Sequence, residues 1–131
     1  MRLLLAVLLL AAAPAAAQDW PGREPIRVIV CAPGGSTVDL TARLWADALK
    51  DRLGATIVVD PRPGGAGVIG AQAVAQARAD GHTLGVCFPG PFTMRPHLQP
   101  TPGFDPLVDL RAVAILMTAP FLFVVDAGVA H

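Results

Sequence analysis

The run Ile26-Arg27-Val28-Ile29-Val30, followed closely by the loop Pro33-Gly34-Gly35-Ser36-Thr37, decides how this chain folds. The first run is short, β-branched and stopped by a proline, which predicts a buried strand over residues 26–32. The residues after the loop, 37–53, have the spacing of an amphipathic helix. Glycine lets a backbone approach a ligand closely, and the first N–H groups of a helix have no partner inside it. Strand, glycine loop and helix start together predict a site for a negatively charged group, which the helix dipole also favours.

The same design occurs a second time along the chain. Residues 56–60 predict a second strand, residues 62–67 a second glycine loop, and residues 67–79 an alanine-rich second helix. A turn at Asp80-Gly81 precedes a third strand predicted over residues 83–88. Strands that alternate with helices form parallel sheets with right-handed crossovers. We therefore expect an α/β fold whose ligand lies beyond the carboxyl ends of the strands.

The helix predicted over residues 37–53 has a mixed surface. One of its faces is apolar, as in a helix that packs on a core, and is formed by Leu40, Leu44, Ala48 and Leu49. Gly54 predicts the end of the helix.

The pattern changes beyond the third predicted strand. Prolines break up any regular element there, at positions Pro89, Pro91, Pro96, Pro100, Pro102 and Pro106. Two apolar runs follow, over residues 112–118 and 121–125, and they predict two further short strands.

The first seventeen residues have the pattern of an export signal. Arg2 supplies a positive charge, residues 3–13 are continuously apolar, and Ala15-Ala16-Ala17 matches a cleavage site. Those eleven apolar residues are too few to span a membrane, which takes about 20. Residues 1–17 are therefore predicted to be a secretory signal peptide that exports residues 18–131.

The charge of the mature chain argues against two classes of partner. Without Arg2 the chain has nine basic and ten acidic residues, which gives a net charge near −1. It also has no run of basic residues. Neither nucleic acid nor a membrane surface is expected as the main partner.

Cys31 and Cys87 are the only cysteines, and each stands near the end of a predicted strand. Export permits a disulfide between them. We favour two buried free thiols, because cysteine packs as a small apolar side chain and paired strands rarely give the Cβ geometry of a disulfide. Neither cysteine has a second cysteine or a clustered histidine beside it, so no metal site is predicted.

The second loop contains Gly65-Ala66-Gly67-Val68-Ile69-Gly70, a literal G-x-G-x-x-G. That motif suggests dinucleotide binding, but here it follows the second predicted strand and no acidic residue ends the next one. We therefore expect no nicotinamide cofactor. A purely structural turn is an alternative for this loop, and Arg62 is either a solvated residue or a clamp for a carboxylate.

Ser36 and Thr37 bring hydroxyl groups to the first loop. One of them is expected to cap the helix, and either could reach a ligand oxygen. Catalysis by Ser36 has little support, because there is no G-x-S-x-G elbow and no histidine or acid with an assigned place beside it. Asp39 lies either on the helix surface or in the first turn, facing the ligand.

Taken in order, these segments resemble the Bug family of extracytoplasmic solute receptors, the substrate-binding proteins of tripartite tricarboxylate transporters. The resemblance runs through the whole mature chain and is most specific in its middle. The segments that carry it are Trp20-Pro21, Pro25-Ile26-Arg27-Val28-Ile29-Val30, Ala32-Pro33-Gly34-Gly35-Ser36 with Asp39 and Ala42-Arg43-Leu44, Val59-Asp60-Pro61-Arg62-Pro63-Gly64-Gly65-Ala66-Gly67 with Ile69-Gly70, Ala73-Val74-Ala75, and Asp80-Gly81-His82-Thr83-Leu84. Weaker matches are Phe104-Asp105-Pro106 with Asp109-Leu110, and Phe123-Val124-Val125.

The resemblance implies a two-lobed periplasmic binding protein with an α/β, type II-like fold. Residues 18–110 would form the first lobe, and residues 111–131 would cross into a second lobe that this chain contains only in part. Such a protein would be a monomer that captures a small organic acid, without cofactor, metal or catalytic residue, and delivers it to membrane permease subunits. The residues that would bind the acid are Gly34, Gly35, Ser36, Thr37, Asp39, Gly65, Ala66, Gly67, Phe88, Gly90 and Thr93.

The chain departs from the family pattern in three ways. Its first loop takes four steps from Gly35 to Asp39 where the family usually has three, and Asp60 stands where the family usually has asparagine. Family members are also more than twice as long. Two alternatives to a receptor are an exported α/β hydrolase-type enzyme that uses Ser36 or Thr37, and a non-functional gene fragment.

Overall fold

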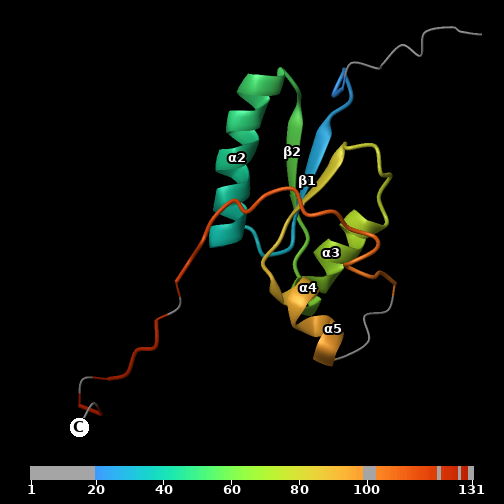
Figure 1. Ribbon diagram of the computed structural model, residues 1–131. Helices are drawn as coiled ribbons and strands as arrows, with labels where there is room; N and C mark the ends of the chain where they lie inside the picture. Colours follow the sequence, from blue (N-terminus) through green and yellow to red (C-terminus); the bar gives the residue numbers. More distant parts are fainter. Residues whose placement is uncertain (1–19, 99–102, 121, 127, 130–131) are drawn as a thin grey trace, which may run out of the picture.

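The computed structural model describes residues 20–98, 103–120, 122–126 and 128–129. The predicted signal peptide, residues 1–17, lies outside the described residues. Strands and helices alternate as predicted in the first part of the lobe (Figure 1). The elements are β1 (Ile26–Val30), α2 (Thr37–Leu53), β2 (Ile57–Pro61), the short 3₁₀ turn η1 (Gly65–Gly67), α3 (Val68–Ala75), β3 (Thr83–Val86), α4 (Gly90–Thr93) and α5 (Arg95–Leu98).

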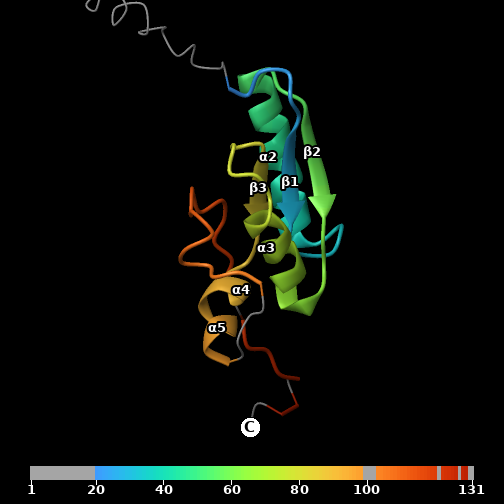
Figure 2. The same ribbon diagram turned by 90° about the vertical axis from the view of Figure 1, so that its right-hand side faces the viewer.

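Three parallel strands form the sheet in the order β2-β1-β3. The central strand is β1, whose Val30 is in register with Pro61 of β2 and with Val86 of β3. Helix α2 covers one face of the sheet and α3 covers the other (Figures 1 and 2). This arrangement confirms the α/β class, and it buries β1 from both sides, which explains why that strand is almost continuously apolar.

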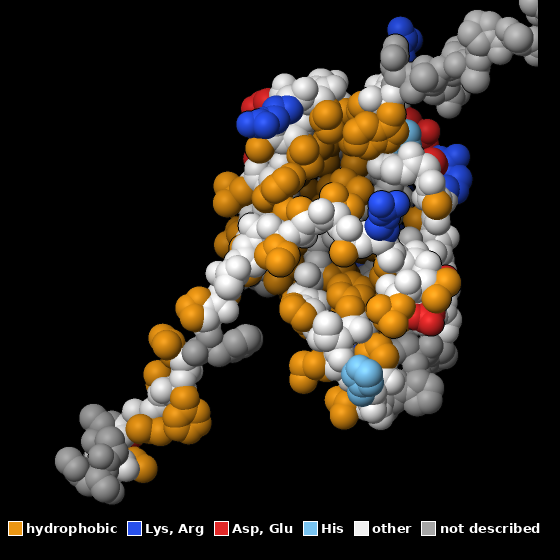
Figure 3. Space-filling model, in the orientation of Figure 1, with side chains coloured by type: hydrophobic (Ala, Val, Ile, Leu, Met, Phe, Trp, Pro, Cys, Tyr) orange, Lys and Arg blue, Asp and Glu red, His pale blue; other side chains and the backbone are white. Residues whose placement is uncertain are grey.

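Helix α2 packs on the sheet through small side chains. Ala42 is fully buried and lies with Val28 and Val30 in one core cluster. The predicted apolar face is wrong in part, because Leu40 and Leu44 are exposed, Leu44 by 73%. Short alanine side chains let the helix lie close to the sheet, and this leaves the leucines on its outer side. Figure 3, in the orientation of Figure 1, shows apolar side chains gathered over the upper part of the lobe, from α2 across toward the strands.

A second core cluster lies under α3. Cys31, Ala71 and Phe104 are buried in it, and Phe92 and Leu110 pack against it. The segment after β3 therefore folds back onto the lobe.

Two short helices, α4 and α5, stand where the prolines predicted irregular chain. Pro91 lies in the first turn of α4. Proline is tolerated there because the first N–H groups of a helix have no intrahelical partner, so the prediction was wrong for these two turns.

No strand forms in the described part of residues 112–125, so the two strands predicted there are wrong. The segment is extended, with Val113 and Ile115 exposed. A strand needs a neighbour that supplies its hydrogen bonds, and the described sheet consists of β2, β1 and β3. Figure 1 shows the segment crossing the lobe to α2, where the Thr41 hydroxyl lies 3.0 Å from the sulfur of Met117.

Candidate functional site

The segments that follow the three strands meet at one edge of the sheet. Because the strands are parallel, their carboxyl ends all point toward the lower part of Figure 1, where α2 starts and α4 lies. We call this the carboxyl edge. It carries the first loop (residues 33–36), the second loop (residues 62–67) and the third segment (residues 88–93).

The first loop ends in the N-terminal cap of α2. The Ser36 hydroxyl oxygen accepts a hydrogen bond from the backbone N–H of Asp39 at 3.3 Å, which confirms that one of the two loop hydroxyls caps the helix. Gly35 has a φ of 78°, in the left-handed region that favours glycine. A side chain at Gly34 or Gly35 would meet no atom within 4 Å, so the backbone of this loop is open to an approaching molecule.

Asp39 is a buried charge in the first turn of α2. Its side chain is 2% exposed, so of the two positions considered for it, the helix surface is wrong. Its Oδ2 atom accepts hydrogen bonds from Arg43 Nε at 3.0 Å and from the backbone N–H of Gly35 at 2.8 Å. These hydrogen bonds, with that of Arg43 the strongest cause, hold the pKa of Asp39 below its ordinary value. Its Oδ1 atom is buried and has no hydrogen-bond partner among the described residues.

The backbone of the second loop lies in a conformation that glycine adopts readily. The φ angles of Gly64, Gly65, Ala66 and Gly67 are all positive, and Ala66, at 52°, is the one non-glycine residue with a positive φ in the described chain. The turn is closed by a hydrogen bond of 2.9 Å from the Gly67 N–H to the Gly64 carbonyl. The loop is therefore a tight turn that directs its backbone beyond β2.

Arg62, at the start of the second loop, is engaged with its own strand. Its Nε atom lies 3.0 Å from Oδ2 of Asp60, and both side chains are partly exposed. The Nε atom of the guanidinium group, which the sequence suggested as a clamp for a ligand carboxylate, is thus already paired with Asp60.

The third segment contacts the second loop through the ring of Phe88. A Cβ atom on Gly67 would lie 2.8 Å from Cζ of Phe88 and 2.8 Å from Cγ of Pro91. Gly90 lies beside the same ring, where a Cβ atom would be 3.2 Å from Cε2 of Phe88. Glycine is thus required at position 67 by close approach as well as by its φ of 85°.

Cys31 and Cys87 form a disulfide, so the expectation of two free thiols is wrong. Each cysteine directly follows the last residue of its strand, and β1 and β3 are neighbours. Because Val30 is in register with Val86, the next residues of both strands stand opposite each other, with Cα atoms 4.8 Å apart. That separation lies inside the usual range for disulfides. The expectation that paired strands lack the Cβ geometry of a disulfide failed because both cysteines lie just beyond Val30 and Val86, the last residues paired between β1 and β3.

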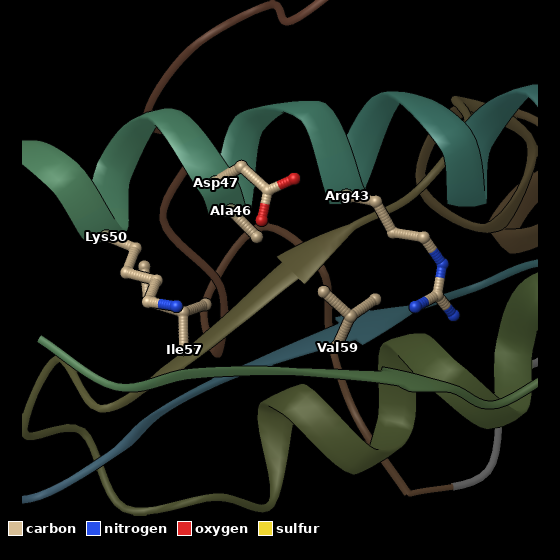
Figure 4. Close-up of a pocket in the computed structure, with 6 residues that line it drawn as sticks. All are labelled: Arg43, Ala46, Asp47, Lys50, Ile57 and Val59. Atoms are coloured by element: carbon tan, nitrogen blue, oxygen red, sulfur yellow. The ribbon is translucent and has the colours of Figure 1, made fainter.

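Two grooves in the described part of the lobe lie away from the carboxyl edge. The larger has a volume of about 260 Å³ and lies between α2 and β2, where Arg43 and Lys50 extend from the helix toward the strand that carries Val59 (Figure 4). Another, of about 220 Å³, lies at the opposite edge of the sheet, near His82. Neither groove is lined by a residue predicted to bind the ligand.

Two further properties bear on the kind of site. Among residues 20–98 and the described segments after them, no three His, Cys, Asp or Glu side chains are grouped so that they could hold a metal ion. Over the same residues, no helix combines the length and the apolar character needed to cross a bilayer.

The residues predicted to bind the ligand fall into two groups. Gly67, Phe88 and Gly90 are in close contact, whereas Gly34, Gly35, Ser36, Thr37 and Asp39 form the first loop and the start of α2. The hydroxyl of Thr93 donates to the carbonyl of Pro89 at 3.1 Å, within its own turn. Sequence reasoning missed Arg43 as the partner of Asp39, although a spacing of four residues on a helix signals such a pair.

A parallel α/β lobe with glycine loops gathered at the carboxyl edge of its sheet is the arrangement of a ligand-binding domain. With the similarity to a solved structure given below, the fold class is that of a lobe of a periplasmic binding protein. The family described as "Tripartite tricarboxylate transporter family receptor" matches residues 41–130. The chain therefore belongs to this family of transporter receptors, and the resemblance found in the sequence is confirmed.

Individual relatives are similar over most of this chain. It is 44% identical to a UPF0065 protein of Bordetella bronchiseptica over 126 residues, which cover 95% of this chain and 37% of the relative. It is 38% identical to Protein BugT of Bordetella pertussis over 116 residues, which cover 88% of this chain and 35% of BugT. The chain thus spans little more than a third of the length of these curated relatives.

One solved structure is similar in both sequence and fold. It is described as R. palustris Rpa4515 with adipate, and it has 40% identity and a TM-score of 0.52. The match covers 55% of this chain and 24% of that one.

Proposed function

We propose that this chain supplies one lobe of a periplasmic receptor that captures a small carboxylate and delivers it to the permease subunits of a tripartite tricarboxylate-type transporter. The observation that carries the proposal is the convergence of three glycine-bearing segments on one edge of a parallel sheet. Membership in the receptor family supports it. So does the similarity to a protein whose structure is described with adipate, a dicarboxylate.

The first loop would hold the acid mainly by its backbone. The open space around Gly34 and Gly35 leaves room for a carboxylate, and the seventeen-residue helix α2 directs the positive end of its dipole at the same place. Ser36 and the exposed Thr37 would supply hydroxyl groups. The charge of Asp39 opposes an anion less than a free carboxylate would, because it is paired with Arg43.

The second loop and the third segment would form the other side of the site. Gly65, Ala66 and Gly67 present backbone groups beyond the end of β2, and Phe88 supplies an apolar wall against Gly67. Gly90 and Thr93 would complete this side from α4. Binding of this kind uses dipoles and hydrogen bonds and requires no covalent step and no cofactor.

The organisation of the chain follows from the same proposal. Residues 1–17 would direct export to the periplasm, residues 18–110 would form the first lobe, and residues 111–131 would lead toward the second. The protein would act as a monomer, with the acid and the permease as its partners.

Isothermal titration calorimetry with a panel of di- and tricarboxylates, adipate included, tests the proposal. We expect at least one acid to bind and its neutral diamide not to bind. Thr37→Ala should weaken binding by about three- to tenfold, the effect of one hydrogen bond. The matched control is Thr56→Ala, which alters an exposed threonine just before β2 at the opposite edge and should leave the affinity unchanged.

Failure of every acid in the panel to bind would contradict the proposal, and two further results would indicate another function. One is binding of a neutral sugar or of a metal ion by a protein that binds no acid. The other is hydrolysis of an activated ester that disappears in Ser36→Ala, which would favour an exported enzyme.

A further inference from the structure

We propose that the Cys31–Cys87 disulfide is the positioning element of the carboxyl edge: it fixes the first loop relative to the third segment and so sets the geometry in which the acid is bound. The inference rests on the function proposed above for this edge. It assigns a role in binding to two residues that are themselves not expected to touch the ligand.

The disulfide stands at the base of two of the three segments. Cys31 lies two residues before Pro33, where the first loop starts, and Cys87 directly precedes Phe88. Cys31 is 1% exposed, so the bond is anchored inside the lobe. Because a disulfide permits only a narrow range of Cα separations, the ends of β1 and β3 cannot move apart while the bond is intact.

The second loop lies beside the same bond through Gly70 of α3, and its Arg62 N–H donates to the Val30 carbonyl, next to Cys31, at 2.8 Å. Gly70, in the first turn of α3, lies so close that a Cβ atom there would be 2.9 Å from both Cα and Sγ of Cys31 and 3.0 Å from the carbonyl oxygen of Arg62. Gly67, just before α3, is in equally close contact with Phe88. The disulfide and the residues beside it therefore connect all three segments.

The sheet itself has a support that is independent of the sulfur atoms. The β1–β3 ladder extends from Arg27 to Val30, and the Cys31 N–H donates to the Val86 carbonyl at 3.0 Å. Reduction should therefore leave β1 and β3 paired. The first loop and the third segment would, however, no longer be joined by a covalent bond. This separation is what distinguishes a positioning role from a general contribution to stability.

Amide hydrogen exchange in oxidised and reduced protein without ligand tests the proposal directly. Dithiothreitol transfers two electrons and two protons to the disulfide, which yields two thiols, and the reagent becomes a cyclic disulfide. The reporters are hydrogen-bonded amides in the three segments, Gly35, Gly67 and Phe92, and the internal controls are the amides of Arg27 and Gly54. We expect exchange at the reporters to become roughly tenfold faster on reduction, with the controls unchanged.

The double variant Cys31→Ala, Cys87→Ala repeats this measurement without the reagent. Reduced wild-type protein keeps both sulfur atoms, whereas the double variant removes them, so a comparison of the two separates loss of the bond from loss of packing. Equal acceleration at reporters and controls in the reduced wild-type protein would overturn the proposal, because the bond would then stabilise the whole lobe evenly. Unchanged reporters would overturn it as well.

Calorimetry supplies the second readout. For an acid that binds the oxidised protein, we expect Kd to rise about tenfold on reduction, since the loops must then be ordered at the expense of binding energy. An unchanged Kd would overturn the positioning role and leave the proposed function intact. If no acid binds the oxidised protein, the proposed function fails, and hydrogen exchange still decides the positioning role.

Discussion

The carboxylate of Asp39 accepts a hydrogen bond from the backbone N–H of Gly35, four residues earlier, with 2.8 Å between Oδ2 and N. The same oxygen accepts from Arg43 Nε, one turn further along α2. One side chain thus joins the first loop to the body of the helix, and a single guanidinium balances its buried charge. The shape of the loop therefore depends on the ionised form of Asp39.

Replacing Asp39 with asparagine should destabilise the lobe. The amide keeps the shape of the carboxylate but loses the charge to which Arg43 and the Gly35 N–H are bound. We expect the Tm to fall by roughly 5 °C in a circular dichroism melt. Asp47→Asn, at an exposed position on the same helix, is the control and should melt with the wild-type protein. Equal Tm values for the two variants would refute the role of Asp39.

The same carboxylate should make stability depend on acidity. The pKa of Asp39 is lower in the folded chain than its unfolded value of 3.8. The contribution of this carboxylate to the free energy of unfolding is therefore complete above pH 3.8. This contribution is lost as the pH falls through the pKa that Asp39 has in the folded chain. Urea denaturation from about pH 6 to about pH 3 should show a steeper loss in wild-type protein than in Asp39→Asn. Parallel curves would show that the group does not contribute.

His82 should produce the opposite dependence at higher pH. Its Nε2 atom lies 3.0 Å from the Pro21 carbonyl, and this hydrogen bond, together with the charges of Glu24 and Asp80, raises the pKa of His82 above 6.5. Because the pKa is raised in the folded chain, the protonated imidazole stabilises the fold. This contribution is complete below pH 6.5 and is lost as the pH rises through the pKa of His82 in the folded chain. The NMR titration of the imidazole gives that pKa, and His82→Gln should flatten the stability curve in this range. A titration midpoint below 6.5 would contradict the prediction.

Two glycines of the carboxyl edge should respond differently to alanine. Gly67→Ala places a methyl group against Phe88 and Pro91 at a positive φ, and we expect it to cost about 1–3 kcal/mol. Gly34→Ala meets open space, so its effect should be within about 1 kcal/mol and is expected to be slightly stabilising. Chemical denaturation of both variants checks the contrast. Similar losses in the two would show that the contact between Gly67 and Phe88 is not tight.

The two sides of α2 should also differ in what they tolerate. Leu44 is on the outer side, so Leu44→Gln should change the free energy of unfolding by less than about 0.5 kcal/mol. Ala42 is fully buried against β1, and Ala42→Leu should cost about 1–3 kcal/mol by overpacking. Denaturation by urea distinguishes the two. A large loss in Leu44→Gln alone would restore the helix face expected from the sequence.

Short-range patterns predicted the architecture well. The β-branched run over residues 26–30 and the glycine loop after it located β1, the Ser36 cap and the start of α2 within a residue or two. Alternation of strands and helices was enough for a parallel sheet. The carboxyl edge followed from that topology without knowledge of any contact.

Features that depend on neighbours in space were harder to predict. The face of α2 was misjudged because leucine is more apolar than alanine, while close packing on a sheet selects for small volume. The disulfide required knowledge that β1 lies beside β3 and that both strands end one residue before a cysteine. The strands predicted within residues 112–125 failed because an apolar run becomes a strand only beside a partner.

The two tryptophans of this chain have a practical consequence for optical work. Trp20 packs edge-to-face on His82, with ring centroids 6.2 Å apart, and Trp45 lies on the exposed side of α2. Neither belongs to the first loop, the second loop or the third segment. Tryptophan fluorescence of this chain will therefore change on unfolding but hardly at all on ligand binding. A fluorescence assay of binding needs a dye attached near the exposed Thr93.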